Sequence, residues 1–226
     1  MKHAAAFFVL GLAFLAAAIS LRGAWWIALW PAVSFLIVAI GYAGAGASIF
    51  GKQHDGRLAW WAKLLLWPFL LVNALIWNLQ RLGESANCAD RIAPGIWLGR
   101  RARCREVPDD VRVIVDITAE FPAQRQVVAS RSYVCLPTLD GMPSDEHKLE
   151  QMLQRLAREQ RVMYIHCAQG RGRSAAVAAA LLIRKGLAAD VDEAERMLRA
   201  ARPSIRISPA QRRLVAKISR LSPARA

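Results

Sequence analysis

The sequence has few cysteines, few acidic residues and few charges in its first 80 residues. Its four cysteines show no metal-binding spacing and are too sparse for a disulfide framework, so a reducing setting is the simplest interpretation. The 17 acidic residues are outnumbered by 31 lysines and arginines, which gives a net charge of +14. No nucleic-acid-binding motif accompanies this excess. We therefore expect anionic lipid or phosphorylated partners, and no nucleic acid.

The chain changes in composition near residue 80. Residues 1–80 contribute +4 of the net charge, so the remainder carries +10. Seven of the eight tryptophans lie in this apolar part, as expected for an element that meets membrane interfaces. We expect a membrane anchor at 1–80, a globular domain at 81–221 and a frayed tail at 222–226.

Three apolar stretches make up the expected anchor. Ala4–Leu21 and Ala24–Phe50 have spanning length, and the second has a Gly/Ala-rich end that allows close helix packing. Leu58–Leu79 contains lysine, proline and asparagine, so it either spans or lies in the interface as an amphipathic helix. The first stretch also fits a signal peptide, but the apolar stretch that follows it favours a helical hairpin.

The distribution of positive charge indicates an orientation. With two spans, Lys2, Lys52 and Arg57 lie on one side of the membrane and Arg22 lies on the other. The positive-inside rule then places the globular domain in the cytoplasm, which also suits a free nucleophilic thiol. With a third span the rule gives less guidance.

Short strands alternate with helices after residue 94, which predicts an α/β sandwich with a central sheet. β-Branched and apolar runs predict strands at Gly95–Gly99, Val111–Asp116, Ser132–Leu136 and Arg161–His166. Apolar spacing, caps and a glycine stop predict helices at Ser144–Gln160, Gly172–Lys185, Asp190–Ala201 and Pro209–Leu221.

A cysteine lies between the last of these strands and an Ala-rich helix, in the sequence His166-Cys167-Ala168-Gln169-Gly170-Arg171-Gly172-Arg173-Ser174. A loop that enters a helix N-terminus gathers backbone N–H groups around one point and forms an anion site. Gly170 and Gly172 allow the backbone to curl, and the positive environment favours the thiolate of Cys167.

Two further side chains complete the predicted site. Arg173 can return to the loop and hold two phosphate oxygens with its planar guanidinium. Ser174 can donate a hydrogen bond to the sulfur. None of the other three cysteines has an arginine six residues after it. The alternative is an inert buried cysteine at a strand end, which the surrounding glycines and flanking elements disfavour.

The nonapeptide resembles the signature loop of the dual-specificity phosphatases, a branch of the cysteine-dependent protein tyrosine phosphatase superfamily. The resemblance covers roughly residues 87–221. Similar segments occur in the expected order at Ile96-Trp97-Leu98-Gly99, Thr138-Leu139-Asp140 with Pro143, and Arg202-Pro203 with Ile205, Ile207, Pro209 and Gln211. The resemblance implies a central mixed sheet flanked by helices, here preceded by an all-α transmembrane region.

The resemblance also implies a mechanism. Cys167 attacks phosphorus and forms a phosphocysteine, while Arg173 and the amides of residues 168–172 stabilise the phosphate oxygens. Asp140 protonates the leaving oxygen and then activates water. We expect His166 to orient the loop and support the thiolate. No metal or other cofactor is required.

Three other carboxylates are rivals for the acid. Asp145 and Glu146 lie where a helix N-terminus favours acidic residues, so we interpret them as capping residues. Asp116 follows a strand and is interpreted as a turn or structural residue. Asp140 therefore remains the preferred candidate.

The substrate class is left open between two hypotheses. Arg171 adds positive charge to the loop, and the Gly-Arg-x-Arg-Ser ending resembles the mitochondrial phosphatidylglycerophosphate phosphatase branch of the family. Together with a short tether to the membrane, this favours a phospholipid head group over a phosphorylated protein. A third hypothesis is a non-catalytic phosphate-binding membrane adaptor, which the combination of Cys167, Arg173 and an acid disfavours.

Overall fold

The computed structural model describes residues 2–21, 24–83 and 86–221. The chain separates into two compact units, Met1–Ser85 with Ala119–Pro122, and Ala86–Thr118 with Ala123–Ala226. The expected tail at 222–226 lies outside the described residues. The domain boundaries at residues 80 and 221 stay a prediction.

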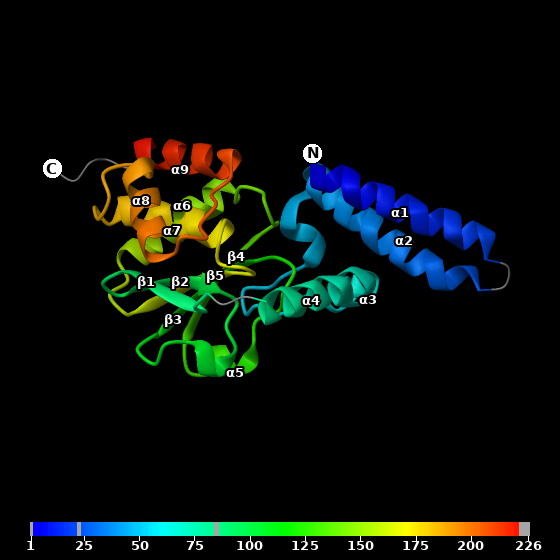
Figure 1. Ribbon diagram of the computed structural model, residues 1–226, viewed down its shortest axis with the longest axis horizontal. Helices are drawn as coiled ribbons and strands as arrows, with labels where there is room; N and C mark the ends of the chain where they lie inside the picture. Colours follow the sequence, from blue (N-terminus) through cyan, green and yellow to red (C-terminus); the bar gives the residue numbers. More distant parts are fainter. Residues whose placement is uncertain (1, 22–23, 84–85, 222–226) are drawn as a thin grey trace. The chain divides into compact units, whose positions relative to one another are not determined.

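The N-terminal unit is built from helices (Figure 1). They are α1 (Lys2–Ser20), α2 (Trp25–Ile40), a π-helical turn η1 (Gly41–Ala45), a 3-10 turn η2 (Gly46–Phe50), α3 (Trp60–Leu65) and α4 (Trp67–Leu82). The all-α character expected for this region is confirmed.

Close packing joins α1 to α2. A Cβ atom on Gly11 would lie 2.8 Å from Cγ and Cδ2 of Leu36, so glycine lets the two helices approach. The ring of Phe35 stacks on Phe14, with centroids 5.8 Å apart, and lies 6.2 Å from the ring of Phe7. The two helices therefore form a hairpin held by small and aromatic residues.

Two helical segments, Lys2–Ser20 and Trp25–Phe50, are long and apolar enough to cross a membrane, by length and composition alone. The third apolar stretch is divided at Leu66, which leaves α4 with 16 residues. A helix of that length is roughly 24 Å long, shorter than the approximately 30 Å of a bilayer core.

The second unit contains a five-stranded mixed sheet in the order β1-β2-β5-β3-β4. The strands are β1 (Ala89–Ala93), β2 (Ile96–Arg100), β3 (Val113–Thr118), β4 (Ser132–Thr138) and β5 (Met163–Cys167). β1 pairs antiparallel with β2, and all other pairs are parallel. The mixed sheet confirms the expected fold class.

Helices cover both faces of this sheet (Figure 1). α6 (Glu146–Ala157), α7 (Arg173–Arg184), α8 (Val191–Ala201) and α9 (Pro209–Leu221) pack on one face, and α5 (Arg125–Val128) lies on the other. A short 3-10 turn, η3 (Cys104–Glu106), follows β2.

The central strand β5 explains where the site forms. Each of its residues is buried, and Met163, Ile165 and Cys167 belong to the core under α6–α9 while Tyr164 belongs to the opposite core. The parallel strands β2, β3, β4 and β5 run in the same direction, so their carboxyl ends meet at one edge of the sheet. Ligands of open α/β sheets bind at this edge.

Candidate active site

The Cys167 sulfur lies at the carboxyl end of β5 and accepts hydrogen bonds from two donors. The Gly170 N–H donates to Sγ at 3.2 Å, and the Ser174 hydroxyl donates to it at 3.3 Å. Cys167 is 3% exposed. The sulfur of the nucleophile candidate is therefore buried and held by two fixed donors.

The carbonyl groups of the loop after Cys167 accept hydrogen bonds from residues outside the loop. Four consecutive carbonyls accept such hydrogen bonds. Ala168 O accepts from Arg101 N at 3.2 Å, and Gln169 O accepts from Arg202 Nη2 at 3.3 Å. Gly170 O accepts from Arg202 Nε at 3.0 Å, and Arg171 O accepts from Arg206 N at 2.8 Å. In a planar trans peptide the N–H points opposite to the C=O. The amides of residues 169–172 are therefore turned away from these outer partners, as the N–H of Gly170 on the sulfur illustrates.

Glycine is required at position 170 for two reasons. Its φ is +70°, in the left-handed region that side chains disfavour. A Cβ atom there would also lie 2.3 Å from the Gly99 carbonyl carbon and 2.5 Å from Arg100 N. The loop therefore packs directly against the end of β2.

Arg173 is the first residue of α7 and is 2% exposed. Its Nη1 donates to the Thr138 carbonyl at 2.9 Å, at the end of β4. Its Nε lies 3.1 Å from Oδ1 of Asp140. The guanidinium thus connects the helix that follows the loop to the segment that carries the predicted acid.

Asp140 lies in a turn two residues after β4. The Met142 N–H donates to the Leu139 carbonyl at 3.2 Å, and Gly141 adopts a φ of +72°. Gln211 of α9 donates from Nε2 to the Met142 carbonyl at 3.0 Å. The Asp140 side chain is 71% exposed, so it can exchange protons with water.

The rival acids are engaged elsewhere, and Glu146, in the first turn of α6, pairs with Lys217 of α9. Asp145 caps α6 by accepting the Lys148 N–H at 2.9 Å. Asp116 accepts the Thr118 N–H at 2.8 Å on Oδ1 and the Tyr133 hydroxyl at 2.8 Å on Oδ2. Burial, together with this carboxylate, raises the pKa of Tyr133 far above its ordinary value, so the phenol keeps the proton it donates. These contacts fit capping and structural roles.

His166 lies beside the backbone of the nucleophile candidate and is 7% exposed. Its Nδ1 is 3.4 Å from the Cys167 carbonyl oxygen and 4.0 Å from Oδ1 of Asp116. Its role in orienting the loop stays a prediction, as do the catalytic roles of Cys167, Arg173, Asp140 and Ser174. The structure brings these five residues to one edge of the sheet.

Four residues that contact the site had no role assigned from the sequence. Arg101, Arg202 and Arg206 bind loop carbonyls, and Gln211 binds the turn that carries Asp140. Arg202 and Gln211 belong to the matched segment that leads into and opens α9, so that resemblance was the available signal. Arg202 contacts Gly170 across 32 residues of sequence, and Gln211 contacts Met142 across 69. The periodicity of apolar residues gives no indication of such long-range contacts.

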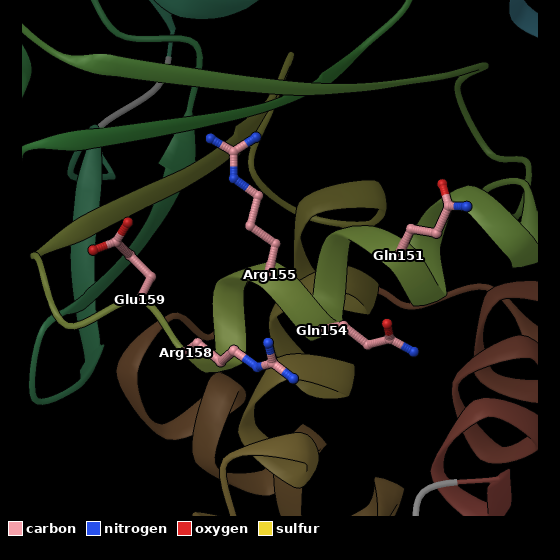
Figure 2. Close-up of a pocket in the computed structure, with 5 residues that line it drawn as sticks. All are labelled: Gln151, Gln154, Arg155, Arg158 and Glu159. Atoms are coloured by element: carbon pink, nitrogen blue, oxygen red, sulfur yellow. The ribbon is translucent and has the colours of Figure 1, made fainter.

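A separate hollow of about 510 Å³ lies on the outer surface of α6 and the turn after it (Figure 2). It is lined by Gln151, Gln154, Arg155, Arg158 and Glu159. None of the predicted site residues lines it. Across residues 2–21, 24–83 and 86–221, no group of three or more His, Cys, Asp or Glu side chains is arranged to hold a metal ion.

A family model described as "Swiss Army Knife protein, DSP-PTPase phosphatase domain" (PTP-SAK) matches residues 100–218. This match covers slightly more than half of the chain. The chain belongs to the PTP-SAK DSP-PTPase family. Its second unit is therefore a phosphatase domain, and the fold and loop geometry described above are those of this domain. A search of curated proteins finds no match.

Solved structures share the fold of the DSP-PTPase domain. PTPMT1 in complex with PI(5)P is 23% identical, with a TM-score of 0.53, covering 59% of this chain and 96% of its own. Tk-PTP in the active form is 24% identical, with a TM-score of 0.53, covering 59% and 97%. A mouse putative dual specificity phosphatase complexed with zinc tungstate is 22% identical, with a TM-score of 0.51, covering 62% and 91%.

Proposed function

We propose that the chain is a membrane-anchored phosphatase that hydrolyses phosphate monoesters through a phosphocysteine on Cys167. The observation that carries this proposal is the pair of hydrogen bonds from Gly170 N–H and Ser174 Oγ to the Cys167 sulfur. Both donors stabilise a thiolate before attack, and the hydroxyl also stabilises it as a leaving group in the second step.

The first step forms a sulfur–phosphorus bond and breaks the bond between phosphorus and the ester oxygen. Hydrogen bonds from the fixed N–H groups and from the Arg173 guanidinium stabilise the negative charge on the phosphate oxygens. These donors need little reorganisation because they are already held in place. The outer hydrogen bonds on the four loop carbonyls supply that rigidity.

Asp140 acts as the acid and then as the base. It gives its proton to the departing ester oxygen, and its carboxylate then takes a proton from the water that attacks the phosphocysteine. The second step releases inorganic phosphate and restores the thiolate. The exposed side chain of Asp140, beside Arg173, supports this assignment.

Membrane anchoring is supported by the apolar surface of the N-terminal helices. α1 leaves Phe8, Val9 and Leu12 exposed, and Trp25 and Trp26 are exposed at the start of α2. Lipid is the environment that favours such a surface, and indole rings favour its interface. With two spans, the distribution of Lys2, Lys52 and Arg57 supports a cytoplasmic orientation of the phosphatase domain.

A phospholipid head group is the preferred substrate class. The anchor keeps the domain near the bilayer, and PTPMT1, which shares the fold, was crystallised with the phosphoinositide PI(5)P. The net charge of the chain also favours an anionic surface. A phosphorylated membrane protein is the second candidate, because the same tether serves it equally.

The test uses purified full-length protein with an aryl phosphate, a phosphotyrosine peptide and phosphatidylglycerophosphate vesicles. We expect turnover of the vesicles to exceed that of the peptide, and Cys167→Ser to abolish turnover of every substrate. Cys104→Ser is the matched control, because that thiol lies outside the loop and donates to the Gln126 carbonyl. Acid quenching with radiolabelled substrate should trap label on the wild-type protein and not on Cys167→Ser.

Three results would change this proposal. Equal or greater turnover of the peptide would indicate that phosphoproteins are the substrate class. Turnover that survives Cys167→Ser would rule out a phosphocysteine on Cys167 as the intermediate. A wild-type protein that binds phosphate but hydrolyses none of the three substrates would be the non-catalytic membrane adaptor.

A further inference from the structure

Arg202 is a buried cation with acceptors on two sides. Its exposed fraction is 1%, and four hydrogen bonds leave its guanidinium. Two reach the phosphate loop, at Gln169 O and Gly170 O. The other two, both from Nη1, reach Asn87 O at 2.9 Å and Asp90 Oδ2 at 2.6 Å. Arg202 therefore connects the first strand of the domain to the loop.

The charge of Arg202 is compensated by Asp90. Burying a guanidinium is unfavourable unless an anion and hydrogen bonds compensate the lost hydration. Asp90 lies in β1, and its other carboxylate oxygen accepts the Asn87 amide at 3.1 Å. The carboxylate is thus fixed at both oxygens, and only 15% of its side chain is exposed. Charge-assisted hydrogen bonds of this kind are the stronger ones in proteins.

The two loop carbonyls held by Arg202 control two amides of the site. Gln169 O belongs to the peptide plane whose N–H, from Gly170, donates to the Cys167 sulfur. Gly170 O belongs to the next plane, whose N–H comes from Arg171. Because each plane is rigid, fixing its carbonyl fixes the opposite N–H. If a carbonyl lost its hydrogen bond to Arg202, its peptide plane could rotate. The N–H on the opposite side of that plane would then move away from the oxygens of a bound phosphate.

We propose that Asp90 is a positioning residue of the phosphatase site, and that it acts through Arg202 on the Gln169 and Gly170 carbonyls. This inference rests on the proposed function only in taking the loop as the phosphate-binding site. Asp90 contacts no atom of the loop itself among the contacts described. It fixes the guanidinium that sets the orientation of two inward amides.

The experiment compares Asp90→Asn, Asp90→Glu and Arg202→Lys in the full-length protein. Asp192→Asn is the matched control, because it removes an exposed carboxylate paired with Arg212 and leaves the loop untouched. Each variant is measured for kcat and KM on an aryl phosphate, for its thermal unfolding midpoint, and for protection of Cys167 from iodoacetamide by inorganic phosphate. The last readout needs no turnover.

Asp90→Asn and Arg202→Lys should each lower kcat roughly 10- to 100-fold and raise the phosphate concentration for half-protection at least about tenfold, as expected when oxyanion donors are misplaced. Asp90→Glu should recover part of both, since it restores the anion. Asp192→Asn should stay within about twofold of wild type.

The proposal is overturned if Asp90→Asn lowers only the unfolding midpoint while kcat and phosphate protection, measured below that midpoint, match wild type. It is also overturned if phosphate fails to protect wild-type Cys167, because the loop would then hold no oxyanion. A wild-type protein that is inactive yet protected by phosphate would contradict the proposed function alone. In that case weaker protection in Asp90→Asn would still support positioning.

Discussion

Asp140 Oδ1 lies 3.1 Å from Nε of Arg173, so the predicted general acid and the predicted phosphate-binding cation form one ion pair. The pair is asymmetric, since the guanidinium is 1% exposed and the carboxylate 71% exposed. A phosphate bound by the Arg173 guanidinium would therefore lie close to Asp140. This arrangement gives the acid an orientation while leaving it in contact with water.

Asp140→Ala tests the acid. Loss of proton donation should slow hydrolysis of alkyl phosphates about 100-fold, because a poor leaving group needs the proton, and should change hydrolysis of an activated aryl phosphate far less. The measurement is kcat across a series of leaving groups. Asp145→Ala is the control. It removes the α6 cap and should cost about 1 kcal/mol of stability without any dependence on the leaving group. A uniform effect of Asp140→Ala would assign the acid to another carboxylate.

Arg173→Lys tests whether a point charge can replace the planar guanidinium. Lysine cannot contact the Thr138 carbonyl and also present two parallel N–H groups to phosphate, so kcat/KM should fall about 100- to 1000-fold. Arg184→Lys at the other end of α7 is the matched control and should stay near wild type, because its ion pair with Glu150 is partly exposed. Activity within about tenfold of wild type in Arg173→Lys would contradict bidentate binding.

Much of the phosphatase domain was predictable because its elements have strong local patterns. All four expected strands and all four expected helices are present, with ends shifted by at most three residues. β1 and α5 were missed. Ala89–Ala93 alternates weakly and contains Asp90 and Arg91, and α5 has only four residues. Such elements depend on tertiary pairing more than on their own composition.

The candidate site residues that lie in one short segment could be found from the sequence. Cys167, Gly170, Arg173 and Ser174 lie within eight consecutive residues, so their spacing, the loop glycines and the flanking strand and helix together single them out. The support from Arg202 was not predictable, because its partners Asn87 and Asp90 lie more than 100 residues earlier and become neighbours only when β1 joins the sheet. The division of the third apolar stretch at Leu66 likewise had no clear sequence signal beyond Pro68.

Tyr133→Phe should change the pH dependence of stability. Burial first, and the Asp116 carboxylate second, raise the pKa of Tyr133 above its unfolded value of about 10. The contribution of the protonated phenol to the free energy of unfolding is therefore fully present below pH 10. It is lost as the pH rises further, at about 1.4 kcal/mol per pH unit. Near pH 8 the variant should be less stable by about 1 kcal/mol, because Asp116 loses a donor.

The measurement is the free energy of unfolding by urea between pH 8 and pH 11. The difference between wild type and Tyr133→Phe should shrink above pH 10 and then reverse in sign. A difference that stays constant over this range would mean that the phenol ionises in the folded protein as it does in the unfolded chain.

Gly170→Ala separates steric contact from backbone strain. Gly170 and Gly186 share a φ of +70°, so alanine at either position incurs a similar strain of about 1–2 kcal/mol. At position 170 the new Cβ would meet backbone atoms at 2.3 Å and 2.5 Å, whereas at position 186 no described atom beyond the adjoining residues lies within 4 Å of it. The loop in Gly170→Ala must therefore move away from β2, which displaces the amide that contacts the Cys167 sulfur. We expect kcat/KM to fall more than about 100-fold in Gly170→Ala and to stay near wild type in Gly186→Ala. Equal activity in the two folded variants would mean that the approach of the loop to Gly99 does not set the geometry of the site.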